Sequence, residues 1–193
     1  MYAILTAIVI ALQLLCTFIK FGPFSITLAL TPIIVGAAIY GPKCGAFLGF
    51  IFSAVVYVTG LMGYDGGFIN MMMQYNAVGT TVLCLAKGTA AGAVSGLVYK
   101  VLSGKNTLAA TMTASIAAPV TNTGLFAAGI LTIFYGFLSG FAADGQSPIG
   151  VLFLSWIGIN FIVELIVNIA LGTVITRVVD YYNKKLAKNG LIK

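Results

Sequence analysis

The sequence predicts one all-α domain, residues 1–193, embedded in a membrane, with six transmembrane helices and both termini in the cytoplasm. Hydrophobic residues make up 60% of the chain, charged residues only 7%, and mean hydropathy is +1.08. Ordinary soluble domains carry roughly 25% charged residues. A bilayer core of about 30 Å needs roughly 20 apolar residues per helix, so the chain has room for about six spans. The apolar stretches are continuous rather than alternating, which excludes a transmembrane barrel.

Six apolar runs alternate with breaks that contain glycine, proline or charge. They cover about residues 2–19, 26–41, 44–63, 77–102, 108–139 and 149–182. The first run lacks a basic flank and is longer than the core of a signal peptide, so we expect it to remain as a span. The second run is short, because it would reach only about 24 Å at 1.5 Å per residue.

The charges predict the orientation of these spans. Most of the ten Lys and Arg residues fall on the side of the termini, whereas Lys20, Asp65 and Asp144 fall on the other side. The positive-inside rule therefore places both termini in the cytoplasm, and it explains the net charge of +6 without a nucleic-acid partner. The outward connections are then residues 20–25, 64–76 and 140–148. The two longer ones are rich in Gly, Asn, Gln and Tyr, as binding loops often are.

Two ionisable residues lie deep in the predicted spans. Lys87 is about ten residues inside the fourth run, or roughly 15 Å from its outer end. Glu164 is the acid that lies deepest in the predicted hydrocarbon region. An ionisable residue at such a depth is costly, so we expect each to face the bundle interior and to have a partner. Either the two residues form an ion pair with each other, or one or both contact a substrate.

Further polar residues surround this pair in the sequence. In the last run, Trp156, Asn160, Glu164 and Asn168 recur at a spacing of four and so share one helical face. The fifth run contains Pro119, which removes a backbone hydrogen bond. The polar residues that follow it are Thr121, Asn122 and Thr123. They either satisfy the freed carbonyl groups or line a pocket.

Together these residues predict a polar pocket in the outer half of the bundle, covered by the outward loops. Binding pockets are mostly apolar with a few fixed polar groups, which fits this set. The candidate lining residues are Lys87, Thr121, Asn122, Trp156, Asn160 and Glu164 in the spans, and Tyr64, Gln74, Tyr75 and Asn76 in the loop. The aromatic residues among them are equally typical of anchors at the membrane surface.

Small residues recur at a spacing of four in three of the runs, as they do where helix backbones pack closely. They are Gly45, Gly49 and Ser53 in the third run, Gly88, Gly92 and Gly96 in the fourth, and Ala3, Ala7 and Ala11 in the first. We predict that the glycine stripes pack inside the bundle. The alanine stripe faces either the same bundle or another protein, and spacing alone does not decide between them.

Three segments carry a family resemblance: "TPIIVGAAIYGPKCGAFLGFIFS", "AKGTAAGAVSGLVYK" and "APVTNTGLF". With the six short runs and the alanine stripe, they resemble the substrate-binding S components of energy-coupling factor (ECF) vitamin transporters. The resemblance implies a six-helix subunit in the plasma membrane of a prokaryote that captures a vitamin from outside. It implies as partners a transmembrane scaffold subunit, contacted through Ala3, Ala7 and Ala11, and two ATPase subunits that use the ATP, so that the chain itself needs no cofactor.

The nature of the vitamin is a separate question, because one fold can bind unrelated ligands. An intramembrane lysine favours an anion, and pantothenate also offers hydroxyl and amide groups that Asn122 and Asn160 could bind. Folate, biotin and riboflavin are the alternatives. An ion-coupled secondary transporter is the main rival function, and a purely structural subunit is another. An enzyme is disfavoured, because the chain has no histidine, no paired cysteines and no phosphate-binding loop.

Overall fold

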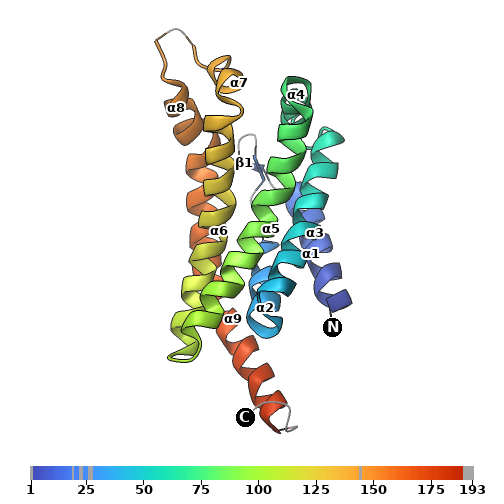
Figure 1. The fold of residues 1–193 in the computed structure, drawn as a ribbon, viewed down its shortest axis with the longest axis vertical. Helices are drawn as coiled ribbons and strands as arrows, with labels where there is room; N and C mark the ends of the chain where they lie inside the picture. The colour runs from blue at the N-terminus through green and yellow to red at the C-terminus, as the bar shows by residue number, and fades with distance from the viewer. Residues whose placement is uncertain (1, 19, 22–23, 26–27, 144, 189–193) are drawn as a thin grey trace.

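The computed structural model describes residues 2–18, 20–21, 24–25, 28–143 and 145–188, and these form a bundle of helices along one long axis (Figure 1). In chain order the elements are α1 (Tyr2–Thr17), β1 (Lys20–Phe21), β2 (Phe24–Ser25), α2 (Leu30–Tyr40), α3 (Pro42–Leu61), α4 (Phe68–Tyr75), α5 (Ala77–Leu102), α6 (Thr107–Thr132), α7 (Tyr135–Ser139), α8 (Pro148–Gly150), the π-helix η1 (Val151–Ile157) and α9 (Gly158–Lys188). The two short strands pair antiparallel.

Each predicted apolar run contains a helix, and four of these helices are long and apolar enough to cross a membrane. They are Pro42–Leu61, Ala77–Leu102, Thr107–Thr132 and the continuous stretch Pro148–Tyr182. The apolar helices α1 and α2 are shorter, with 16 and 11 residues. The chain is therefore an all-α multi-pass membrane protein, and six crossings stay a prediction.

The helical ends differ from the prediction at two places. The predicted helix over residues 108–139 ends at Thr132, and α7 follows as a separate helix, because Phe134 leaves helical geometry at φ −114° and ψ 21°. Phe134 and Leu138 are fully buried. The predicted loop over residues 64–76 contains α4, and the Asp65 carboxylate accepts the amides of Gly67 and Ile69 at the start of this helix. Phe68, Ile69 and Met72 of α4 are buried, so apolar packing accompanies both differences.

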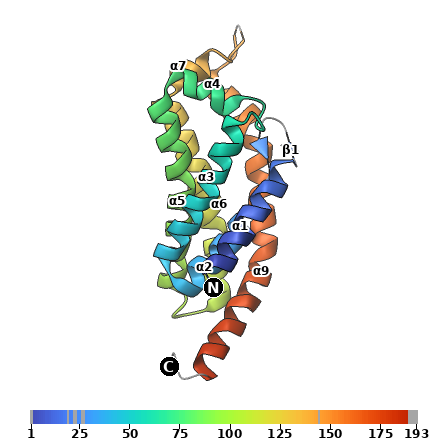
Figure 2. The same cartoon turned by 90° about the vertical axis from the view of Figure 1, so that its right-hand side faces the viewer.

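The two ends of the bundle are distinct. The N-terminus of α1 and the C-terminal part of α9 lie toward one end, and α4, α7 and α8 lie at the other (Figures 1 and 2). The connection over residues 64–76, which the charge pattern places outside, therefore lies at the end away from both termini, whereas β1 lies part-way along the bundle on that side.

The core is organised around a close contact between α3 and α5, which we call the glycine seam. It is made by Gly45, Gly49 and Ser53 of α3 with Gly88 and Gly92 of α5. A Cβ atom on Gly45 would overlap the carbonyl oxygen of Gly92, and one on Gly49 would overlap that of Gly88. The Gly88 amide also donates to Ser53 Oγ at 3.2 Å. The prediction that these glycine stripes pack inside the bundle is confirmed.

Candidate binding site

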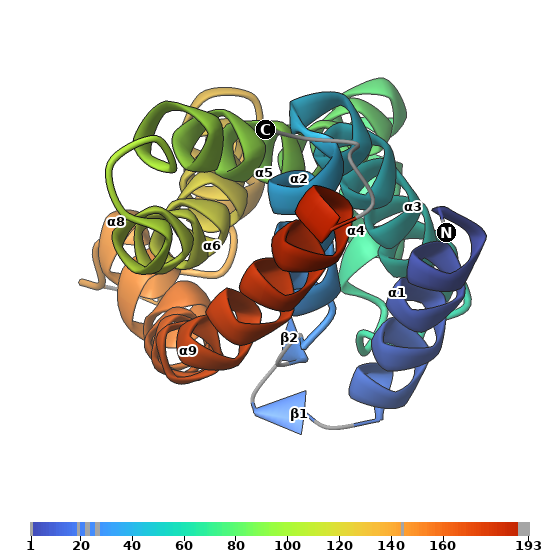
Figure 3. The same cartoon turned by 90° about the horizontal axis from the view of Figure 1, so that it is seen from below.

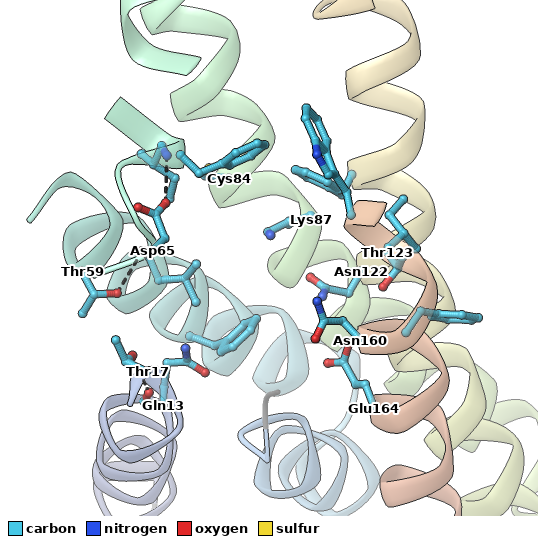
Figure 4. A pocket seen from close by; sticks show the side chains of 18 of the residues that line it. Gln13, Thr17, Thr59, Asp65, Cys84, Lys87, Asn122, Thr123, Asn160 and Glu164 are labelled. Carbon is cyan, nitrogen blue, oxygen red and sulfur yellow. Dashed lines mark hydrogen bonds between the residues drawn. The ribbon is translucent and has the colours of Figure 1, made fainter. Parts of the chain in front are cut away.

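A cavity of about 130 Å³ lies between the helices toward the end that carries α4 and α7 (Figure 4). An engineered apolar cavity of about 150 Å³ can hold benzene, so the space suits a small organic molecule. Its lining comprises Gln13, Thr17, Phe52, Val56, Thr59, Tyr64, Asp65, Phe68, Ile69, Met72, Cys84, Lys87, Asn122, Thr123, Phe126, Trp156, Ile157, Asn160, Phe161 and Glu164. The walls are mainly apolar with a few polar groups, as in small-molecule sites.

Aromatic rings form one part of the lining. Phe68 of α4 packs edge-on against Trp156 of η1, with ring centroids 4.9 Å apart and an interplanar angle of 86°. Phe68 also contacts Phe126 of α6, at 6.4 Å between centroids. Such pairs hold ring positions firmly. The π-helical stretch η1 presents Trp156 to Phe68 of α4 and to Phe137 of α7, the latter at 6.2 Å between centroids, so this part of the cavity has a defined shape.

Lys87 projects from α5 into the cavity (Figure 4). Its Nζ atom lies over the Phe126 ring, 5.0 Å from the centroid, in the geometry of a cation–π contact. Lys87 and Glu164, which both belong to the described part of the chain, form no ion pair with each other. The alternative in which these two residues neutralise each other directly is therefore not the arrangement in this structure.

The opposite lining, which we call the polar wall, consists of Asn122 of α6 with Asn160 and Glu164 of α9 (Figure 4). Asn122 Oδ1, Asn160 Oδ1 and Glu164 Oε1 are buried, and each lacks a hydrogen-bond partner in the described structure. Asn122 is 8% exposed and Glu164 is 7% exposed. Buried polar atoms without partners are rare in native proteins, because each loses its hydration without compensation. Three on one wall indicate that the partner comes from outside the chain.

The structure brings six of the predicted site residues together around the cavity. They are Tyr64, Lys87, Asn122, Trp156, Asn160 and Glu164. Thr121 does not join them, because the next residues along α6, Asn122 and Thr123, occupy the face that turns toward the cavity. Whether the six residues contact a ligand stays a prediction.

The predicted loop residues Gln74, Tyr75 and Asn76 also lie outside the lining, because local structure uses or exposes them. Asn76 caps α5, and its Oδ1 accepts from the Gly79 amide at 2.8 Å. The Tyr75 ring packs against Phe134, with centroids 6.0 Å apart. Gln74 is exposed. Their pattern in the sequence indicated polarity near the site, but not which side chains turn toward it.

Several lining residues were not among the predictions. Asp65 precedes α4, and its carboxylate accepts from the amides of Gly67 at 3.0 Å and Ile69 at 2.8 Å. Gln13 and Thr17 line the cavity from α1. Their signal in the sequence was a polar pair at a spacing of four in an otherwise apolar run, which is the same signal that singled out Asn160 and Glu164.

The other face of α1 carries the alanine stripe. Ala3, Ala7 and Ala11 are exposed, whereas Val9 and Gln13 of the same helix are buried. Seen along the long axis, α1 lies at the edge of the bundle beside α3 (Figure 3). The stripe is thus not covered by the chain's own described residues, and a partner on it stays a prediction.

Comparisons with known proteins identify the family of this chain and a solved structure with a similar fold. The family model described as "ECF transporter, substrate-specific component" matches residues 2–179, which confirms the resemblance that the sequence motifs predicted. The solved structure of ThiT from Listeria monocytogenes is similar, with a TM-score of 0.61 over 95% of this chain and 93% of that chain. The two chains are 19% identical, so this likeness shows the fold alone. No curated protein matches the chain.

Proposed function

Because this chain belongs to the family of ECF transporter substrate-specific components, we propose that it captures a vitamin outside a prokaryotic cell for import across the plasma membrane. The family consists of transport components rather than enzymes, and its members work with a scaffold and ATPases. In this proposal both termini are cytoplasmic and the cavity opens outward. ATP is hydrolysed by the partner subunits, and the chain carries no cofactor of its own.

The observation that supports vitamin binding most strongly is the set of unsatisfied groups around one cavity. Lys87 offers an ammonium group that forms no ion pair with Glu164, and the polar wall offers three unpaired oxygen atoms. A ligand that supplies an anion to the former and hydrogen-bond donors to the latter would compensate both. In a purely structural subunit, these unsatisfied groups would lower stability without serving a function.

Pantothenate is the cargo that we propose first. Its carboxylate would contact Lys87, and its hydroxyl and amide groups would donate to Asn122 and Asn160. Its branched aliphatic centre would lie against the aromatic part of the lining. Folate, biotin and riboflavin remain alternative cargoes, and each is larger than pantothenate.

A second candidate is a cationic vitamin, and one observation favours it. Two carboxylates, Asp65 and Glu164, line the cavity with a single lysine. The rings of Phe68, Phe126 and Trp156 could also face a cation. We rank it second because both oxygens of Asp65 already accept backbone amides, which leaves Glu164 alone to attract a positive charge.

The partner proposal concerns α1. We place the scaffold subunit against the exposed stripe of Ala3, Ala7 and Ala11, because small side chains let another helix approach closely. The vitamin then binds on one face of α1, near Gln13 and Thr17, and the scaffold docks on the other.

Thermal unfolding of the purified protein with a panel of vitamins tests the proposal without any partner subunit. A ligand present at 100 times its dissociation constant adds about 2.7 kcal/mol to the native state. We expect pantothenate to raise the melting temperature and riboflavin to have no effect. Stabilisation by a cationic vitamin instead would support the second candidate. A folded sample that no vitamin stabilises would contradict vitamin binding.

A further inference from the structure

The charged groups around the cavity do not balance once an anion is bound. The charged side chains in the lining are one ammonium, Lys87, and two carboxylates, Asp65 and Glu164. Asp65 is compensated locally, because its two oxygens accept the amides of Gly67 and Ile69 at the start of α4. An anionic cargo would occupy Lys87. Glu164 forms no direct ion pair with Lys87, so the positive charge of Lys87 acts on it only through space, and a bound anion would cancel that attraction.

An uncompensated carboxylate at this position is costly. Glu164 is 7% exposed, and its Oε1 has no hydrogen-bond partner in the described structure. The cavity also contains Lys87 and Cys84 of α5 and Tyr64, and Lys87 is the one cation of the described lining, whereas α6 and η1 contain no charged or titratable side chain. The titratable group of α2, Tyr40, bonds the hydroxyl of Tyr182 instead. Burying one charge without a partner costs far more than burying a matched pair.

We propose that the cavity binds a monovalent cation, either a proton or a sodium ion, at Glu164 whenever it holds an anionic cargo at Lys87. The proposal rests on the proposed function, because the cargo's negative charge is what cancels the through-space attraction of Lys87 for Glu164. Cargo and cation then bind with positive linkage, so that each raises the affinity for the other.

The neighbours of Glu164 fit such a cation. Asn122 and Asn160 each contribute an unpaired amide oxygen on the same wall (Figure 4). A proton on Glu164 Oε1 would turn that atom into a donor for such an oxygen, and a sodium ion would be held by carboxylate and amide oxygens, which suit hard cations. One carboxylate with neutral amides suits a single positive charge.

Titration calorimetry of the purified protein with pantothenate tests the linkage. The titrations run from pH 6 to pH 8.5, and separately with sodium replaced by N-methylglucamine at constant ionic strength. If a proton binds, affinity falls as pH rises, by up to about tenfold per pH unit, because the complex holds one more proton than the free protein. If sodium binds, affinity rises with sodium concentration and changes little with pH.

Two variants locate the cation. Glu164→Gln, which is permanently neutral, should bind pantothenate without any dependence on pH or sodium. Asp180→Asn removes a carboxylate from the same helix outside the cavity, and it should keep the wild-type dependence. An affinity of the wild-type protein that ignores both pH and sodium would overturn the inference, as would a dependence that persists in Glu164→Gln.

The outcome also separates this inference from the proposed function. Binding of an anionic vitamin without linkage contradicts the cation at Glu164 and leaves the proposed function standing. If no vitamin binds, the proposed function itself fails. Binding of a cationic vitamin that Glu164→Gln abolishes would overturn the inference, because the cargo would then supply the positive charge.

Discussion

Two helix pairs in this molecule pack in contrasting ways. At the glycine seam, α3 and α5 approach until the backbone of one helix contacts that of the other, and the one polar side chain there, Ser53, bonds the Gly88 amide at 3.2 Å. Where α6 and α9 face the cavity, Asn122, Asn160 and Glu164 keep buried oxygens without partners. At the first contact the chain itself satisfies the polar side chain, whereas at the second the buried oxygens lack hydrogen-bond donors.

The difference separates residues that stabilise the fold from residues kept for a ligand. Close backbone packing gains van der Waals contact and leaves nothing unsatisfied. Unpaired buried oxygens lower stability, and proteins retain such groups mainly where function needs them. Substitutions in the seam should therefore destabilise the empty protein, whereas substitutions of cavity groups should lower the affinity for the cargo without destabilising the empty protein.

The largest expected effect is in the seam. Gly92→Val places a side chain against the Gly45 carbonyl oxygen, which belongs to backbone and cannot rotate away. We expect a loss of about 3 kcal/mol in the free energy of unfolding, measured by denaturation in detergent, because overpacked cores must shift their backbone. Gly124→Val on α6, where a Cβ meets no atom within 4 Å, is the matched control and should stay close to the wild type. Equal stability of the two variants would contradict close backbone packing at the glycine seam.

Substitution in the alanine stripe on the exposed face of α1 should leave the stability of the protein unchanged, unlike substitution in the glycine seam. Ala7→Leu alters the exposed face of α1, so we expect the protein to fold and to bind its vitamin normally. Uptake by cells that contain the complete transporter should be lost, because the scaffold helix could no longer approach. The two readouts are vitamin uptake and affinity in detergent. Weakened affinity with normal assembly would refute this placement of the partner.

Around the cavity, Lys87→Ala should weaken binding of an anionic vitamin by about 2 kcal/mol, or about 30-fold, the scale for removing one partner of a buried charged pair. Calorimetry measures the change. Lys100→Ala removes an exposed lysine from the other end of α5, and it should leave affinity unchanged. Unchanged affinity in a folded Lys87→Ala protein would make Lys87 a structural residue.

The smallest expected effect has the opposite sign. Asn122→Leu removes a buried oxygen that has no partner, so the empty protein should gain about 1 kcal/mol in stability while its affinity for the vitamin falls. Asn76→Ala makes the matched comparison, because Asn76 caps α5 through a bond to Gly79. Loss of that cap should cost about 1 kcal/mol. Thermal unfolding without ligand distinguishes a gain from a loss, and a loss in both variants would contradict the contrast between them.

The sequence predicted those parts of the site that lie on single helices. Asn160 and Glu164 share one face of α9 because their spacing follows the α-helical repeat, and Lys87 stood out because a charge is rare at such a depth. The glycine seam was predictable for the same reason. These features depend only on positions within one helix and on the surrounding hydrocarbon. Trp156 also lines the cavity, but from the π-helical stretch η1, which the sequence did not predict.

The remainder depends on how the connections fold back onto the bundle. Asp65 reaches the cavity because the segment before α4 turns at glycines with positive φ, among them Gly66 and Gly67. The fifth predicted run is broken because burial of Phe134 outweighs helix continuity. Asn76 was a plausible site residue by composition, but capping of α5 uses its side chain. Such competition between local and tertiary contacts leaves no clear periodic trace in the sequence.

The central claim is that the unpaired groups of the cavity are the binding groups for an anionic cargo. The most direct measurement is calorimetry with pantothenate and with its alcohol analogue, in which CH₂OH replaces the carboxylate, each titrated into the wild type and Lys87→Ala. We predict that the wild type binds pantothenate one to one and the alcohol about 30-fold more weakly, and that Lys87→Ala binds the two alike. Equal affinities of the wild type for the two compounds would contradict the claim.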